Sequence, residues 1–144
     1  MSIIKSLHKD FSIAAYEKGA SQNNIEKLKE FSSIEVPKEY IDLVKEATEI
    51  EIGVQKKMFI RIWSPEGCIE LNEAYNIQLD FPNSLAIGDD EGGKALLYMT
   101  GSQGFGLYKS DFGDPFPEDA TFLASSLREL LVDGIGIEKL LYDY

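Results

Sequence analysis

Three consecutive acidic residues, Asp89, Asp90 and Glu91, lie between an apolar run and a Gly-Gly pair in the stretch FPNSLAIGDDEGGKALLYM (81–99). Carboxylates at this density could hold a divalent cation, and the adjacent glycines could cradle a phosphate. The spacing fits neither site, because a calcium loop needs ligands at alternating positions with a distant Glu, and a phosphate loop ends in Gly-Lys-Ser/Thr. Asp and Gly tolerate left-handed backbone angles, so we expect a tight turn between two strands and no metal.

Nucleophilic catalysis would need a positioned base, and the chain has a single histidine, His8. The only cysteine, Cys68, cannot close an internal disulfide or build a zinc site of several thiolates. No spacing among the 25 acidic residues singles out a carboxylate pair for glycoside chemistry. We therefore expect no catalytic residues, no cofactor and no metal ligands.

The stretch QGFGLYKSDFGDPFPEDATF (103–122) interleaves aromatic and acidic residues. Gly113, Pro115 and Pro117 stop regular structure, which predicts a surface loop over 111–119. Aromatic anchors beside carboxylates suit an interface that receives a basic partner, whereas the alternative is that the phenylalanines form a satellite core under the loop. The candidate partner-binding residues are Asp89, Asp90, Glu91, Asp111, Phe112, Asp114, Phe116, Glu118 and Asp119.

The charge is unevenly distributed along the 144 residues, whose net charge is −11. Residues 1–72 carry ten basic and twelve acidic side chains, whereas 73–144 carry four and thirteen, so −9 of the total lies in the second half. Such a field repels nucleic acid and anionic lipid and attracts cationic partners, although acidity also keeps a protein soluble. No apolar run approaches the roughly 18 residues of a membrane span. Lys5, Lys9 and Asp10 interrupt any signal peptide, so we expect a cytoplasmic protein.

The elements that must position these residues are predicted from periodicity and capping. The first helix is expected from an Asn23 cap through Phe31, and the second from Pro37 to Ala47. Strand-like runs follow at 49–54, 58–63, 85–88, 94–100 and 104–109, with a short helix at 67–77 between the second and third. The last helix begins at Ser126, where Glu129 completes a capping box, and ends at Gly134.

This order predicts an α+β fold in a single domain, 1–144. A mostly antiparallel sheet of about five to six strands would pack against helices at the N- and C-terminal ends, because parallel strands need crossover helices between them. Trp63 lies beside Ile60 and Ile62 on the second strand, so we expect its side chain to be buried.

Four stretches, in this order, resemble the SUKH superfamily, which is named partly after the yeast Smi/Knr cell-wall assembly regulators. They are VPKEYIDLVKEA (36–47), MFIRIWSPEGCIELNEAYNI (58–77), FPNSLAIGDDEGGKALLYM (81–99) and FLASSLRELLVDG (122–134). The shared features are a helix begun by proline, a strand with Trp63, an Asn72-containing segment, a Gly-Asp-x-x-Gly-Gly turn and a late helix. The resemblance covers about 22–134. It departs from the family at 47–49, where an Asn-Gly is common, and at Lys94, where an acid often stands.

The resemblance implies a compact α+β domain without a shared catalytic set. Many bacterial members look like immunity proteins that bind and neutralise a cognate toxin, often a nuclease, of polymorphic or contact-dependent systems. The expected partner is therefore a protein toxin with a basic surface, and neither nucleic acid nor membrane. Two alternatives stay open: a non-catalytic scaffold or regulator of the Smi/Knr type, and a small-molecule binder or enzyme with a pocket lined by Trp63, Tyr75 and Tyr98. The oligomeric state does not follow from the sequence.

Overall fold

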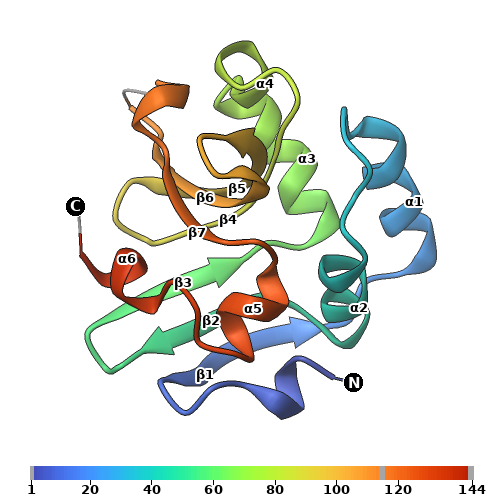
Figure 1. The fold of residues 1–144 in the computed structure, drawn as a ribbon. Coiled ribbons are helices and arrows are strands. Elements are labelled where there is room, and N and C mark those ends of the chain that lie inside the picture. Colours follow the sequence, from blue (N-terminus) through green and yellow to red (C-terminus); the bar gives the residue numbers. More distant parts are fainter. Residues whose placement is uncertain (1, 114–115, 143–144) are drawn as a thin grey trace.

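The protein, described here from a computed structural model over residues 2–113 and 116–142, is built on one antiparallel sheet of seven strands (Figure 1). Each strand pairs with the strand before it in the chain, in the order β1-β2-β3-β4-β5-β6-β7. The strands are β1 (Phe11–Lys18), β2 (Ala47–Val54), β3 (Met58–Ile62), β4 (Leu85–Asp89), β5 (Lys94–Gly101), β6 (Gly104–Asp111) and β7 (Thr121–Ala124). The α+β class is confirmed, with more strands than the five or six expected.

The helices are short and lie around this sheet. They are α1 (Gln22–Phe31), α2 (Lys38–Glu46), α3 (Pro65–Ala74), α4 (Ile77–Asp80), α5 (Leu127–Leu131) and α6 (Ile137–Leu141), with the 3-10 turns η1 (Ile4–Ser6) and η2 (Pro117–Asp119). In Figure 1, α5 and α6 lie in front of the sheet, and α1, α2 and α3 lie at its right side.

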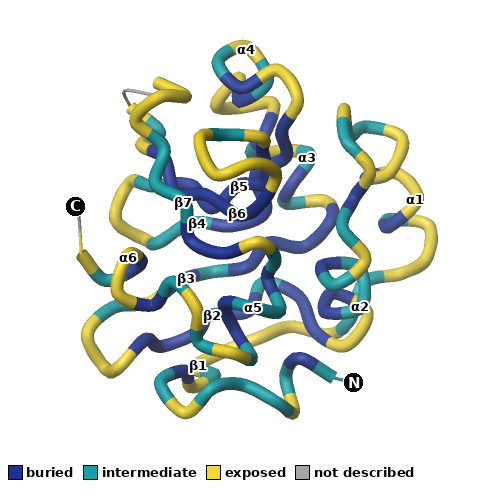
Figure 2. The backbone as a smooth tube through the Cα atoms, in the orientation of Figure 1, coloured by how far each residue is buried: buried dark blue, intermediate teal, exposed yellow. Residues whose placement is uncertain are grey.

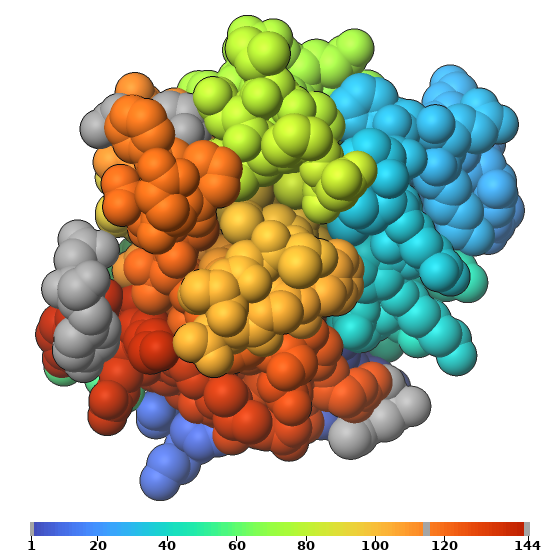
Figure 3. Space-filling model, turned by 45° about the horizontal axis from the view of Figure 1, so that its top comes forward, coloured from blue at the N-terminus to red at the C-terminus, as the bar shows by residue number. Residues whose placement is uncertain are grey.

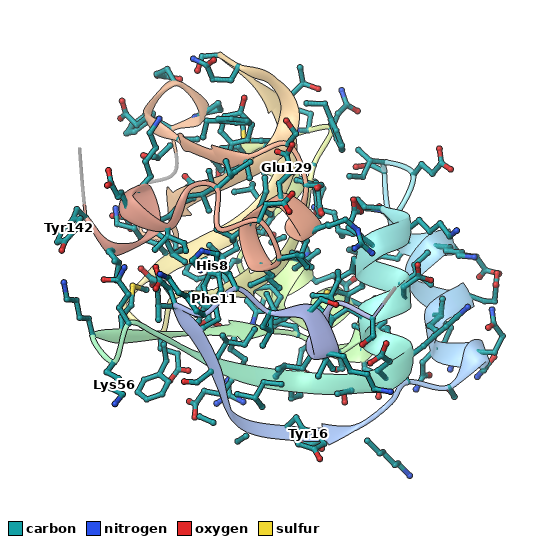
Figure 4. The ribbon with its side chains drawn as sticks, turned by 60° about the horizontal axis from the view of Figure 1, so that its bottom comes forward. His8, Phe11, Tyr16, Lys56, Glu129 and Tyr142 are labelled. Carbon is teal, nitrogen blue, oxygen red and sulfur yellow. The ribbon has the colours of Figure 1, made fainter. Side chains whose placement is uncertain are left out.

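The prediction that helices come first is wrong, because β1 precedes α1. Most of β1 is exposed, and Tyr16 points away from the body of the molecule (Figure 4). An edge strand with so little burial lacks the apolar alternation by which strands are recognised. The predicted cap of α1 is also wrong: Ser21 caps the helix, and its hydroxyl accepts a hydrogen bond from the Asn24 amide at 3.2 Å.

The core lies between the sheet and the helices, and the central strands are buried along most of their length (Figure 2). The predicted start of the C-terminal helix is confirmed: the Ser126 hydroxyl accepts a hydrogen bond from the Glu129 amide, and the inward-facing leucines of α5 are buried. The helix ends at Leu131, three residues before the predicted end at Gly134. Gly134 has φ +75°, and the ring of His8 fills the space that a side chain there would occupy. Only glycine therefore fits this turn.

Asn72 fixes α3 on the sheet. Its side-chain amide, completely buried, donates to the carbonyls of Cys68 (2.7 Å) and Ala86 (2.8 Å). The amide oxygen accepts the backbone N–H of Ala86 (3.0 Å) and the Gln78 side chain (2.9 Å). One side chain thus satisfies both backbone groups of a β4 residue, which sets the position of α3 and of everything that α3 carries.

Candidate protein-binding surface

The acidic stretch 89–93 connects β4 to β5 by a turn, as predicted, but Asp89 is itself the last residue of β4 and is half-buried. The Asp89 Oδ1 atom accepts the Glu91 amide at 2.8 Å, and the Asp90 Oδ1 atom accepts the amides of Gly92 (2.8 Å) and Lys94 (3.0 Å). Glu91 and Gly93 have positive φ, at 55° and 100°. The aspartates therefore shape the turn with their side chains, which explains their density without a bound cation.

The other oxygen of Asp89 binds Trp63. The indole Nε1–H donates to the Asp89 Oδ2 atom at 2.8 Å, and Trp63 is only 2% exposed, so its predicted burial is confirmed. Arg61 lies opposite Asp89 in the β3–β4 ladder, and its guanidinium forms an ion pair with Glu51 of β2 at 3.2 Å. Asp89, Arg61 and Glu51 thus form one polar row on the sheet face opposite Ile50 and Ile62.

Glu91 extends this row with a second carboxyl facing Glu51. Partial burial raises the pKa of Glu91 above its usual value, and the Glu51 carboxyl raises it further through a shared hydrogen bond and charge repulsion. The positive charge of Arg61 lowers the pKa of Glu91, whereas the negative charge of Asp89 raises it. A cationic side chain placed here would relieve the repulsion between the two carboxyls.

Aromatic rings connect this row to the second acidic segment. Phe112 stacks on Tyr75 with ring centroids 4.2 Å apart and on Trp63 at 6.4 Å. The Phe112 amide donates to the Gly93 carbonyl at 3.0 Å, and Asp111 pairs with Lys94 across β5 and β6. The structure therefore brings the 89–93 turn and the start of the 111–119 segment together.

Residues 116–119 lie away from the turn. Pro117 lines a cavity with Phe81 and Pro82, beside α4, and Figure 3 shows this part of the chain in orange next to the lime-green α4 region. Phe116 is 48% exposed, and Glu118 and Asp119 are exposed in η2. Asp114 lies outside the described residues. The predicted site is thus one compact group, Asp89 to Glu91 with Asp111 and Phe112, and a separate arm at 116–119.

Sequence reasoning missed the carboxylates of α3. Glu66, Glu70 and Glu73 are exposed on this helix at i, i+4 and i+7, a spacing that places them on one side. Near the start of α3, the Glu49 Oε2 atom accepts the Ser64 amide at 2.6 Å, so β2 contributes a further carboxylate. The sequence could have shown part of this row, because Glu70 and Glu73 lie within the helix expected at 67–77, whereas Glu66 lies just before it.

The two side chains considered for nucleophilic catalysis, His8 and Cys68, both contact other parts of the structure. The His8 Nδ1 atom accepts the Asp10 amide at 3.1 Å, and the ring packs on Gly134. Cys68 is buried beside the Tyr40 hydroxyl at 3.2 Å, and burial raises the pKa of its thiol to about 12, so no thiolate nucleophile forms near neutral pH. Over the described ranges, no three His, Cys, Asp or Glu side chains are grouped to hold a metal ion, and no helix is long and apolar enough to span a membrane.

The aromatic residues considered for a small-molecule pocket have other roles. Trp63 and Tyr98 are buried, and the Tyr98 hydroxyl accepts the Leu127 amide at 2.9 Å. Tyr75 is 48% exposed and stacks on Phe112. Two of the three side chains therefore build the core, and the third belongs to the surface described above.

A comparison with models of protein families places most of the chain in one of them. The model of the SMI1 / KNR4 family (SUKH-1) matches residues 19–133. No curated protein matches the chain. The matched range begins after β1 and ends just before Gly134, so it contains the 89–93 turn, the aromatic stack and all of α3.

Proposed function

The chain belongs to the SMI1 / KNR4 family (SUKH-1), and on this premise we propose that it is an immunity protein that binds and neutralises a cognate protein toxin in the cytoplasm. The toxin would belong to a polymorphic or contact-dependent bacterial system and would present a basic surface, as a nuclease does. The family is known for immunity roles and is generally non-catalytic. We propose accordingly that this chain acts by binding alone.

The observation that carries the proposal is the acidic, aromatic surface around the 89–93 turn. The stack of Tyr75 on Phe112 adjoins the carboxylates of the turn, because Phe112 also stacks on Trp63, which binds Asp89, and its amide binds the Gly93 carbonyl. Glu51, in the same polar row, is already paired to Arg61. A nuclease groove is built to attract phosphate, and a surface of carboxylates can occupy it as a phosphate mimic. Tyr75, which is 48% exposed, and the half-buried Phe112 beside it are suited to become anchors of the complex.

Attraction between the acidic surface and a basic toxin should set the rate of association. Association should be fast at low salt and slow as salt rises, because the Debye length contracts from about 30 Å at 0.01 M to about 8 Å at 0.15 M. Rim charges act mainly on the association rate, whereas a buried anchor acts on dissociation. We therefore expect Phe112→Ala to cost more than about 2 kcal/mol of binding free energy, mostly through faster dissociation.

The decisive experiment first searches the neighbouring genes for a toxin-like domain. It then expresses that domain with and without this protein and counts surviving cells. The test variant replaces exposed acids of the surface by lysine, at Glu91, Asp111, Glu118 and Asp119. The control variant makes the same charge change at exposed acids elsewhere, at Glu17, Glu30, Asp133 and Glu138. We expect the test variant to associate at least about tenfold more slowly than the control and to protect poorly at limiting expression.

Two results would contradict the proposal at different levels. Equal killing with and without wild-type protein would refute the proposed immunity function and favour a scaffold or regulator of the Smi/Knr type. Equal protection by the test and control variants would keep immunity but place the interface elsewhere. Circular dichroism of each variant shows whether it is folded, so lost protection can be assigned to the surface.

A further inference from the structure

A groove of about 570 Å³ lies between α1 and α3, apart from the aromatic stack. Its lining includes Lys27 from α1 and Glu66, Ile69, Glu70, Glu73 and Ala74 from α3. Ile69 packs against the core and is half-buried, whereas Ala74 is exposed. The groove therefore has apolar side chains along α3 and open access from solvent.

One wall of the groove is strongly acidic. Glu66, Glu70 and Glu73 follow one another along α3 with no hydrogen bond or ion pair to another described residue, and like charges at this spacing destabilise a helix. The opposite wall contributes a single cation, Lys27, which is exposed. The groove thus combines apolar surface with a row of carboxylates that the protein itself does not neutralise.

We propose that this groove binds an amphipathic basic helix of the toxin, so that the contact surface continues from the aromatic stack across α3. An apolar side chain of that helix would pack on Ile69 and Ala74, and lysines or arginines would pair with the three glutamates. The inference rests on the proposed function. Tyr75, at the end of α3, stacks on Phe112, so a partner that covers the stack already touches the helix that forms the groove.

The spacing of the carboxylates favours a helix over an extended segment. With a rise of 1.5 Å per residue, Glu66 to Glu70 spans about 6 Å of α3 and Glu70 to Glu73 about 4.5 Å. Basic residues at i, i+4 and i+7 of a second helix have the same rises. Alternate residues of a strand lie about 6.8 Å apart and lose register over the same length. Nucleic acid is disfavoured because its phosphates would face the glutamates.

A peptide titration tests the groove without the toxin. The probe is a synthetic peptide of about 18 residues, five helical turns, with leucines on one face and lysines beside them; its control has the same composition in scrambled order. We expect the amphipathic peptide to shift the backbone amide NMR signals of Lys27 and Ala74. Glu66→Lys/Glu70→Lys/Glu73→Lys should weaken its binding at least about tenfold, and the equally charged control Glu17→Lys/Asp133→Lys/Glu138→Lys less than about twofold.

Ala74→Trp tests the shape of the groove independently of its charge. Ala74 is exposed, so an indole at this position can fill the groove without altering any carboxylate. With the toxin, this variant should dissociate faster and associate at an unchanged rate. Equal binding of the scrambled peptide, or equal weakening by both triple variants, would overturn the groove inference. A toxin complex unaffected by Ala74→Trp and by the α3 triple variant would overturn it too, while leaving immunity through the aromatic stack intact. A toxin that is not bound at all would refute the proposed function, and the peptide titration would still decide the groove.

Discussion

Replacing Trp63 should destabilise the fold and the proposed binding surface together, because its side chain is part of both. Its indole is 2% exposed, stacks toward Phe112 and donates to Asp89 at 2.8 Å. Trp63→Ala removes the whole ring from a packed site, and substitutions of this type cost about 3–5 kcal/mol of unfolding free energy. Urea denaturation followed by circular dichroism measures this loss; fluorescence cannot, because Trp63 is the only tryptophan.

Trp63→Phe separates the hydrogen bond from the ring. A hydrogen bond to a charged group contributes about 1.5–3 kcal/mol, but Asp89 is only half-buried and water can replace the donor, so we expect about 1–2 kcal/mol for the lost bond and smaller ring. Asp89→Asn keeps an oxygen for the Glu91 amide but turns an NH₂ group toward the indole. A double-mutant cycle of these two variants should give a coupling of about 1 kcal/mol. Coupling near zero, or a Trp63→Ala variant as stable as wild type, would refute this account of the site.

Three other predictions follow from the same contacts. Asn72→Ala leaves the N–H and C=O of Ala86 unsatisfied and should cost about 3–5 kcal/mol in urea denaturation; a loss below about 1 kcal/mol would contradict the clamp between α3 and β4. The raised pKa of Glu91 means that the folded protein holds this proton more tightly than the unfolded chain, so the stability it contributes is lost as pH rises through the raised pKa. Glu91→Gln should therefore gain stability relative to wild type between pH 4 and 7, and a difference that does not change with pH would exclude repulsion from Glu51. Calorimetric titration of the 89–93 turn with calcium, magnesium and manganese should show no site tighter than about millimolar, and micromolar binding lost in Asp89→Asn would show that the turn is a cation site.

Local chemistry accounts for what the sequence could predict. The 89–93 turn, the Ser126 cap and the left-handed Gly134 depend on residues within a few positions of one another, and the structure contains all three. Burial of Trp63 followed from its apolar neighbours on β3. These features need no knowledge of which strand lies next to which.

The failures come from contacts between distant segments. β1 was missed because an edge strand that buries only its first residue has no apolar period. The bond from Trp63 to Asp89 and the stack of Phe112 on Tyr75 join residues at least 26 positions apart. Only the register of β3 to β6 brings these residues together, and no local pattern specifies that register.

The carboxylates of the surface have different structural roles, and these roles determine which substitutions can test the surface. Asp89 and Asp90 bind the backbone of their own turn, and Asp89 also binds Trp63, so their replacement changes the shape of the surface together with its charge. Glu91 and Asp111 are exposed and do not bind the indole, although the Asp111 Oδ1 atom accepts the Gly113 amide at 2.9 Å and Glu91 shares a hydrogen bond with Glu51. All four acids therefore attract a cationic partner, but new ion pairs form most readily with Glu91 and Asp111. Charge reversal at Glu91 and Asp111 should slow association with the fold unchanged, whereas reversal at Asp89 should lower both stability and binding. Equal loss of stability in both cases would show that Glu91 and Asp111 also hold the turn.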